Sequence, residues 1–236
     1  MSAIKQQIVG FVDFTTLNDT DTTESVREFC KRAVTPLGNV AAVCVYPQFV
    51  SVAKETIPAT IGLATVVNFP SGAEEDEAIF AETRQALKDG ANEIDLVFPY
   101  GRFQKGDTQY AHELTEKVGN ICHEAGAKMK VILETGALSA EETHAAAKIA
   151  IAAGADFLKT STGKIKVGAT PEAAAILLAE IKASGKPVGI KLSGGVRELA
   201  AAQGYVQQAV DVMGADWLKA ENFRIGASGL LEVLLK

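Results

Sequence analysis

The sequence predicts a single-domain α/β protein that folds as a (β/α)8 TIM barrel over residues 1–236. Short runs of β-branched and apolar residues recur about every 20 to 35 residues, which is the period of a strand–helix unit. Amphipathic stretches separate these runs, and no Pro/Ser-rich linker or low-complexity tract divides the chain. Alternating strands and helices without a linker favour one shared parallel sheet.

The runs that we expect to form strands are eight in number. They cover residues 8–14, 41–47, 62–70, 93–100, 128–136, 156–162, 187–195 and 222–228. Eight strand–helix units favour a closed barrel. An open doubly wound sheet is the alternative, because a strand count from sequence is uncertain by about one or two. The dinucleotide and nucleotide motifs that would support it are missing, since no GxGxxG opens a helix and no GxxxxGK[ST] occurs.

Several expected helices carry start signals. Ser139 and Glu142 have the spacing of a capping box, in which each residue satisfies a backbone N–H of the other. Asp21 and Glu24 have the same spacing after the first strand, and we expect them to open a helix there. The Thr-Pro pair at 170–171 supplies an N-cap and a first-turn proline for another helix.

Composition limits the partners of the protein. The net charge of −6 and the lack of a basic block argue against a nucleic-acid partner, which needs clustered Lys and Arg. No run reaches the roughly 18 apolar residues that span a bilayer, and the first residues lack the layout of a signal peptide. We therefore expect a cytoplasmic protein that acts on small molecules, with no membrane or nucleic-acid partner.

Neither the cysteines nor the histidines predict a metal site. Cys30, Cys44 and Cys122 are far apart and form no CxxC pair, so buried free thiols are expected instead of disulfides or zinc ligands. The histidines fall in helical stretches without HExxH spacing; they are His112, His123 and His144. No GxSxG elbow occurs either, which argues against a serine hydrolase.

Charged residues inside the expected strands follow one parity. Residues two apart in a barrel strand point the same way, either into the lumen or toward the helices. The positions that we assign to the lumen are Glu93, Asp95 and Val97; Lys130, Ile132 and Glu134; Phe157, Lys159 and Ser161; and Gly189, Lys191 and Ser193. The apolar residues that alternate with them are Ile94, Leu96, Val131, Leu133, Leu158, Ile190 and Leu192, which suit the side that faces the helices. A charge-balanced ion-pair cluster that only fills the lumen is one interpretation, and a catalytic centre near the C-terminal strand ends is the other.

Lys159 has the surroundings that a nucleophilic amine needs. A lysine with the usual pKa of about 10.4 is neutral in only about one molecule in 2,500 at pH 7. A second ammonium about 4 Å away costs the charged form about 4 kcal/mol at an effective dielectric of about 20, or about three pKa units, and burial acts in the same direction. Lys191 on the next strand is the expected second cation. Asp95 is the expected acid–base group, with a simple salt-bridge role as its alternative.

Two glycine-containing loops predict a phosphate site. Gly194 and Gly195 follow the seventh strand, and Gly226 and Ser228 end the eighth. Barrel enzymes often hold phosphate between these two loops, on backbone N–H groups. Lys164 could add a positive charge, although an ordinary solvated loop lysine is an equally good interpretation of it.

Eight motifs follow one another over nearly the whole length of the chain: FVDFTTLND, AAVCVYPQF, ATVVNFP, NEIDLVFPY, KVILETG, DFLKTSTGK, IKLSGGVR and FRIGAS. With these motifs in this order, the sequence resembles the deoxyribose-phosphate aldolase family. The resemblance implies a (β/α)8 class I aldolase that reversibly cleaves 2-deoxy-D-ribose 5-phosphate into acetaldehyde and D-glyceraldehyde 3-phosphate. It also implies that no metal or organic cofactor takes part.

The resemblance assigns a role to each matching residue. It makes Lys159 the Schiff-base lysine, Lys191 the second lysine and Asp95 the proton donor and acceptor. The residues that it places along the substrate are Asp13, Thr15 and Lys130, and those that it places at the phosphate are Gly163, Lys164, Gly194, Gly195, Gly226 and Ser228.

Three departures from the family pattern bear on substrate contacts and rate. Leu192 stands where members commonly carry a smaller residue or proline, and Gly229 where some have a second serine. The sequence ends at LLEVLLK without the tyrosine-bearing tail of some members, so altered proton transfer is expected, not a lost reaction. A transaldolase-like enzyme and a non-catalytic phosphosugar-binding barrel are the competing functions. A homodimer is a further expectation, which periodicity does not separate from packing within one barrel.

Overall fold

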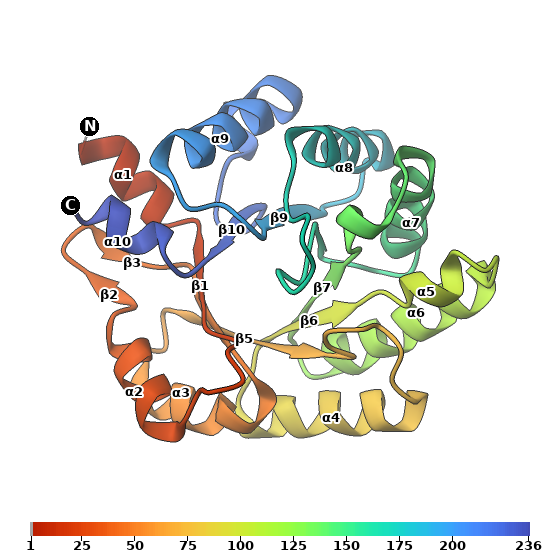
Figure 1. Cartoon of the computed structure of the whole chain (residues 1–236), viewed down its shortest axis with the longest axis horizontal. Coiled ribbons are helices and arrows are strands. Elements are labelled where there is room, and N and C mark those ends of the chain that lie inside the picture. The colour runs from red at the N-terminus through yellow and green to blue at the C-terminus, as the bar shows by residue number, and fades with distance from the viewer. Residues whose placement is uncertain (1) are drawn as a thin grey trace.

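A closed parallel barrel forms the centre of the molecule in the computed structural model, which describes residues 2–236 (Figure 1). The barrel strands are β1 (Val12–Thr15), β4 (Ala42–Val45), β5 (Gly62–Val67), β6 (Glu93–Val97), β7 (Lys128–Ile132), β8 (Phe157–Lys159), β9 (Gly189–Ser193) and β10 (Phe223–Ala227). They neighbour one another in this order, and β1 closes the barrel by pairing with both β10 and β4. The predicted (β/α)8 barrel is confirmed, and the open sheet is excluded by this closure.

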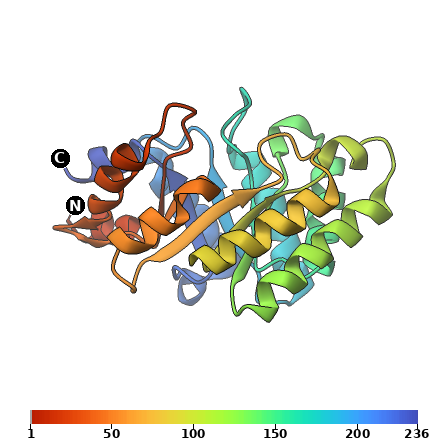
Figure 2. The same ribbon diagram turned by 90° about the horizontal axis from the view of Figure 1, so that it is seen from below.

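Helices surround the barrel and connect its strands, as Figures 1 and 2 show from two directions. The α-helices are α1 (Ser2–Val9), α2 (Thr23–Lys31), α3 (Val50–Thr56), α4 (Asp76–Asp89), α5 (Tyr100–Phe103), α6 (Thr108–Glu124), α7 (Ala140–Ala152), α8 (Pro171–Ser184), α9 (Leu199–Met213) and α10 (Leu230–Leu234). Short 3-10 turns occur at η1 (Pro47–Phe49), η2 (Thr135–Ala137) and η3 (Ala215–Trp217). A small antiparallel hairpin, β2 (Val34–Thr35) with β3 (Gly38–Asn39), precedes β4 and was not predicted.

Two of the expected helix starts are confirmed. Glu142 N–H donates to Ser139 Oγ at 3.1 Å, and Ser139 N–H donates to Glu142 Oε2 at 2.7 Å, which completes the capping box of α7. Ala173 N–H donates to Thr170 Oγ1 at 3.1 Å at the start of α8. Caps of this kind typically stabilise a helix by about 1 kcal/mol.

The expected capping box of Asp21 and Glu24 is wrong. Thr22 is the N-cap of α2, and its partner in the box is Ser25. Asp21 instead turns back to the loop before it, where its Oδ2 accepts from Thr16 Oγ1 at 2.7 Å and from the Asn18 N–H at 3.0 Å. Because Asp21 is engaged in the loop, the N-cap of α2 lies one residue later than the sequence predicted, at Thr22.

Alternation along the strands divides the buried side chains between the core that lies between strands and helices and the lumen of the barrel. The apolar residues between the inward positions belong to the main core between strands and helices; they are Ile94, Leu96, Val131, Leu133, Leu158, Ile190 and Leu192. Burying each such side chain contributes about 1.5–3 kcal/mol. A separate small cluster of Leu17, Cys44, Ala64 and Val66 includes side chains of β4 and β5. The charged residues lie on the remaining strands.

Phe157 fills the lower part of the lumen on β8. Gly189 lies opposite it, and a Cβ atom at position 189 would lie 2.5 Å from the Phe157 ring. The glycine therefore leaves the space that the ring occupies. Arg224 lies over this ring, with Cζ 5.5 Å from the ring centroid.

The sequence predicted buried free cysteines and helical histidines, and it predicted neither a metal site nor a membrane-spanning segment. The cysteines at 30, 44 and 122 are buried and unpaired. His112 and His123 lie in α6 and His144 lies in α7. Within residues 2–236, no three His, Cys, Asp or Glu side chains gather as metal ligands, and no helix has the length and apolarity to cross a bilayer.

Candidate active site

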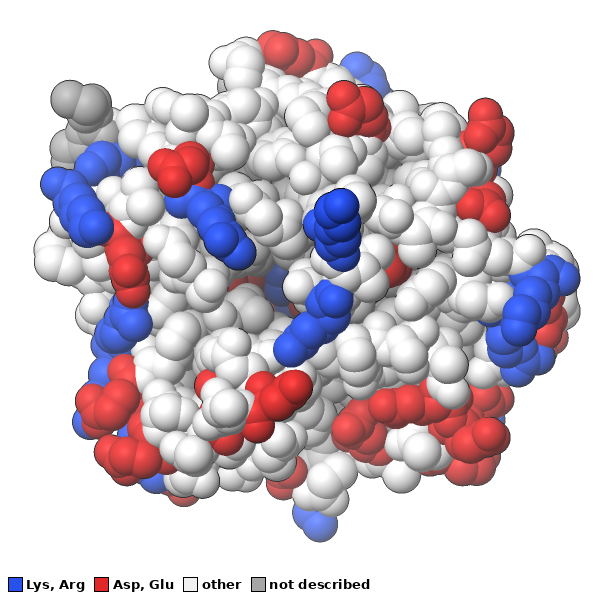
Figure 3. All heavy atoms as spheres, in the orientation of Figure 1, with Lys and Arg blue, Asp and Glu red and all other residues white. Residues whose placement is uncertain are grey.

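A cavity of about 410 Å³ opens at the C-terminal ends of the barrel strands. The hollow is visible near the centre of Figure 3, with lysine and arginine side chains beside it. The predicted residues that line it are Thr15, Lys159, Gly163, Lys164, Lys191, Gly194, Gly195, Gly226 and Ser228. Asp13, Asp95 and Lys130 lie beneath it, fully buried in the lumen. The structure thus brings the expected residues together in two layers.

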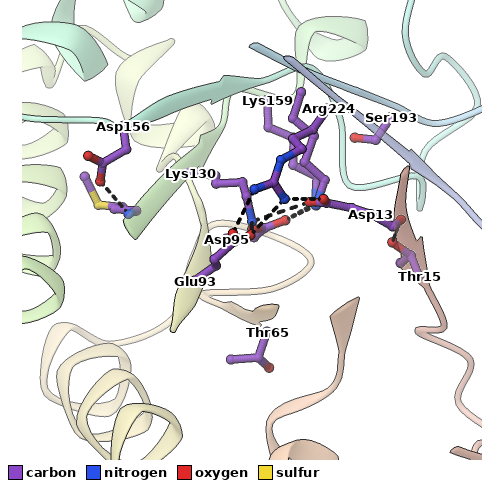
Figure 4. Close-up of polar contacts among 12 residues, drawn as sticks. Asp13, Thr15, Thr65, Glu93, Asp95, Lys130, Asp156, Lys159, Ser193 and Arg224 are labelled. Carbon is purple, nitrogen blue, oxygen red and sulfur yellow. Dashed lines mark hydrogen bonds and ion pairs between the residues drawn. The ribbon is translucent and has the colours of Figure 1, made fainter. Parts of the chain in front are cut away.

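The lower layer is a closed ring of alternating charge, which we call the charge ring (Figure 4). Its members are Asp13, Glu93, Asp95, Lys130, Lys191 and Arg224. Going round the ring, the N–O distances are 2.7 Å for Arg224–Asp13, 2.6 Å for Asp13–Lys191, 2.7 Å for Lys191–Asp95, 2.9 Å for Asp95–Lys130, 2.5 Å for Lys130–Glu93 and 3.0 Å for Glu93–Arg224. Three carboxylates face three cations, so the ring is formally neutral.

Lys159 is a seventh charged group, which contacts the charge ring through Asp95 alone. Its Nζ donates to Asp95 Oδ2 at 2.7 Å, and the same oxygen accepts from Lys191 Nζ at 2.7 Å. Lys130 has three carboxylates within reach, Lys191 has two and Lys159 has one oxygen that it shares. A proton on Lys159 would therefore add a positive charge that no ring carboxylate is left to balance.

The pKa values of the lysines follow these surroundings. Burial lowers the pKa of Lys159; Asp95 opposes this effect and Lys191 adds to it. Burial also acts on Lys191 and Lys130, but their carboxylate partners outweigh it and raise both pKa values. The direction for Lys159 is the one predicted from the sequence. Its largest cause is burial, however, whereas the sequence argument gave that part to Lys191.

Asp95 stays ionised for the opposite reason. Burial alone would raise its pKa, but Lys130, Lys159 and Lys191 together hold the pKa of Asp95 well below its usual range. Asp13 behaves in the same way, because Lys191 and Lys130 outweigh its burial. An ionised Asp95 beside a lysine of lowered pKa is a pair between which a proton can move.

Glu134 lies at the end of β7 and supports the neighbouring loop. Its backbone has a φ of 57°, in the left-handed region, and its side chain is fully buried. Thr162 donates to it from both its N–H and its hydroxyl, and Thr162 Oγ1 accepts from the Lys164 N–H at 3.0 Å. Burial raises the pKa of Glu134. This carboxyl group therefore orders the segment that carries Gly163 and Lys164.

The upper layer forms the mouth of the cavity. Lys164 reaches across it, since its Nζ donates to the Leu17 carbonyl at 2.6 Å and lies 3.8 Å from Asp19. Thr15 Oγ1 donates to the Asp13 carbonyl at 2.8 Å, which fixes the rim above β1. A Cβ at position 226 would lie 2.8 Å from the Ser193 Cβ and 3.1 Å from the Lys191 Cε. Gly226 thus makes room for Lys191 to reach the ring.

Two arginines of the site were missed in the sequence. Arg224 shares the parity of Gly226 in the eighth strand, so the same parity argument would have placed it in the lumen. Arg197 lines the cavity two residues after Gly195, where a basic residue beside a glycine pair was the available signal. Of the departures noted above, Gly229 lines the cavity, whereas Leu192 packs in the main core toward the helices. Leu192 therefore has no direct part in substrate contacts.

Comparison with known proteins places this barrel among the aldolases, which are carbon–carbon lyases. Residues 8–236 match the model for DeoC/LacD family aldolases, and the chain belongs to that family. The resemblance seen in the motifs is thereby confirmed.

Solved structures agree with the family. A chain from Toxoplasma gondii ME49, assigned as a deoxyribose-phosphate aldolase, is 26% identical with a TM-score of 0.88, covering 99% of this chain and 94% of that one. A chain from Coccidioides immitis with the same assignment is 27% identical with a TM-score of 0.86, covering 97% of this chain and 85% of that one. The tetrameric deoxyribose phosphate aldolase from Aeropyrum pernix, 24% identical with a TM-score of 0.80 over 98% and 90% of the two chains, shares the fold.

Proposed function

We propose that this aldolase reversibly cleaves 2-deoxy-D-ribose 5-phosphate into acetaldehyde and D-glyceraldehyde 3-phosphate, with Lys159 as the Schiff-base lysine. One observation carries the proposal: Lys159 is the surplus amine on a charge ring that is neutral without it. It also lines the cavity, and its pKa is lowered. Burial and an excess of positive charge both favour the neutral form of an amine, which is the nucleophile in Schiff-base formation.

In the direction of synthesis, the neutral Nζ of Lys159 attacks the carbonyl carbon of acetaldehyde. The resulting carbinolamine loses water to give an iminium ion, and loss of a methyl proton gives the enamine. The enamine carbon then bonds to the aldehyde carbon of D-glyceraldehyde 3-phosphate, whose oxygen takes up a proton. Hydrolysis of the new iminium releases the product and restores Lys159. Cleavage follows the same steps in reverse.

Asp95 and Lys191 are the groups proposed to move the protons. Asp95 Oδ2 accepts hydrogen bonds from Lys159 Nζ and from Lys191 Nζ, each at 2.7 Å, so both groups lie close to the reacting amine. Asp95 is ionised and is suited to accept the methyl proton, while Lys191 carries a proton that it can donate to a leaving hydroxyl. Asp13 and Lys130 hold these two groups in place from the lower layer.

The mouth of the cavity is suited to the phosphate end of the substrate. Backbone at Gly163, Gly194, Gly195, Gly226 and Ser228 lines it, together with the side chain of Lys164. Arg197 adds a second cation to this lining. Backbone N–H groups and two cations are the donors that phosphate binding requires.

Covalent trapping with acetaldehyde tests the proposal. Protein incubated with acetaldehyde and reduced with borohydride should gain one ethyl group, and peptide mass spectrometry should locate it at Lys159. Lys159→Met should remove the adduct, whereas Lys148→Gln, a change at an exposed lysine of α7, should keep it. A transaldolase-like enzyme would prefer a ketose donor, and a binding barrel would form no adduct. Wild-type protein that stays unmodified would remove the proposed mechanism.

A further inference from the structure

We propose that Arg224 and Glu93, which lie beneath the cavity, are positioning residues that keep the charge ring neutral and thereby set the protonation state of Lys159. The proposal deepens the function proposed above, because it concerns the same lysine. It goes further by giving a task to two buried charges that touch neither Lys159 nor the cavity lining.

Arg224 closes the ring by joining two strands that are not neighbours. Its Nη1 lies 2.7 Å from Asp13 Oδ1 on β1, and its Nη2 lies 3.0 Å from Glu93 Oε1 on β6. The Nε donates to the Ala220 carbonyl, and the guanidinium plane lies over Phe157. A planar guanidinium group with this many fixed contacts cannot easily turn toward another partner. Arg224 therefore fixes both carboxylates at once.

Each ring lysine is shared between Asp95 and the carboxylates that Arg224 holds, and Lys130 Nζ also lies 3.5 Å from Asp13 Oδ2. Lys191 Nζ lies 2.6 Å from Asp13 and 2.7 Å from Asp95. Lys130 Nζ lies 2.5 Å from Glu93 and 2.9 Å from Asp95. Asp13 and Glu93 therefore compete with Asp95 for the ammonium groups of Lys191 and Lys130. The stronger their attraction for these lysines, the more of the negative charge of Asp95 is left to stabilise a protonated Lys159. Arg224 weakens this attraction, because it partly neutralises both Asp13 and Glu93.

The two residues should act with opposite signs. Without the Arg224 charge, Asp13 and Glu93 attract Lys191 and Lys130 more strongly, and Asp95 is left to hold a proton on Lys159. Without the Glu93 charge, Lys130 turns to Asp95, while Arg224 binds Asp13 more fully and releases Lys191 toward Asp95. Asp95 then has less charge to spare for Lys159. Loss of Arg224 should therefore favour the protonated amine, and loss of Glu93 the neutral one.

The groups that face Lys159 directly stay unchanged in this comparison. They are Asp95 from β6, Lys191 from β9, Cys44 from β4 and Glu134 after β7. Burial and Lys191 favour the neutral amine, while Asp95 favours the charged one. A shift seen on changing position 93 or 224 therefore comes from the charge removed at that position and from the rearrangement of the ring that follows.

The experiment measures the pH dependence of adduct formation at Lys159. Wild-type protein, Arg224→Gln, Glu93→Gln and the double variant are treated with acetaldehyde and cyanoborohydride across a pH series, and the modified Lys159 peptide is quantified. We expect the half-maximal pH to rise by about one unit in Arg224→Gln and to fall by about one unit in Glu93→Gln. The double variant should return close to the wild type, as should the charge-conserving Arg224→Lys and Glu93→Asp.

A purely structural role predicts a different outcome. Both single variants would then lose adduct at every pH, with an unchanged or equally displaced midpoint, and that result would overturn the proposal. If Arg224→Gln does not fold, Glu93→Gln still decides, because a downward shift is a gain that disorder does not produce. If both single variants fail to fold, a displaced midpoint in the double variant, which loses one charge of each sign, overturns the proposal and a wild-type midpoint supports it. Failure of wild-type protein to form the adduct would instead refute the proposed function.

Discussion

Replacing Lys191 by methionine isolates the effect of the second ammonium on Lys159. Nζ of each lysine lies 2.7 Å from Asp95 Oδ2, so the two nitrogens are at most about 5.4 Å apart, twice that distance. Two unit charges at this separation repel by about 3 kcal/mol at an effective dielectric of about 20. That energy equals about two pKa units. Asp95 would also be freed to hold Lys159 alone, which acts in the same direction.

We therefore expect Lys191→Met to raise the pKa of Lys159 by about two units or more. At pH 7 the neutral amine, and with it the rate of adduct formation with acetaldehyde, should fall about 100-fold, and raising the pH by about two units should restore most of it. The assay is the rate of reductive trapping at Lys159 across a pH series, with Lys148→Met as the matched surface control. Loss of the proton that Lys191 donates during dehydration would lower the trapping rate at every pH, so the position of the acid limb, and not the absolute rate, reports the pKa of Lys159. An acid limb that stays at its wild-type position would refute the reasoning.

Three further predictions follow from single contacts. Asp95→Asn should slow hydrogen–deuterium exchange at the methyl group of acetaldehyde by about 100-fold or more, measured by NMR, while Lys159 still forms an adduct; undiminished exchange would contradict this. Burial, with a smaller contribution from Glu74, raises the pKa of Glu82 to about 7. An acid whose folded pKa is raised loses stability as the pH rises from about 4.3 through that value, so Glu82→Gln should increase the free energy of unfolding by about 1 kcal/mol at pH 8, after allowance for solvent screening, and change it little at pH 4. Urea unfolding at both pH values measures this, and equal effects would argue against it. Lys164→Gln should raise KM for 2-deoxy-D-ribose 5-phosphate about 10-fold and leave cleavage of unphosphorylated 2-deoxy-D-ribose unchanged; an equal loss on both substrates would exclude a phosphate role.

The barrel was predictable because its signals are periodic. Strand–helix units repeat along the chain, and parity within each strand separates Leu158 and Ile190, which face the helices, from Lys159 and Lys191, which face the lumen. Such patterns survive without knowledge of distant contacts. The same parity places Arg224 in the lumen, so the position of this residue was also predictable from the sequence.

Other features depended on contacts that no local pattern contains. The start of α2 was displaced because Asp21 bonds to Thr16 and Asn18, a choice made by the folded loop. The strength of burial at Lys159 could not be read from neighbouring residues, since it arises from strands far apart in sequence. The closure of the charge ring between residues 13 and 224 is of the same kind.

The oxygen shared by Lys159 and Lys191 has a consequence for the course of the reaction. When the neutral Lys159 becomes an iminium ion, one positive charge appears on that side of Asp95 Oδ2. If Lys191 gives its proton to the departing hydroxide in the same step, one positive charge disappears on the other side, within at most about 5.4 Å. The barrel interior then carries the same total charge before and after condensation. Because these groups are almost fully buried, an added ion would be poorly solvated there, and condensation without a change in total charge avoids that cost.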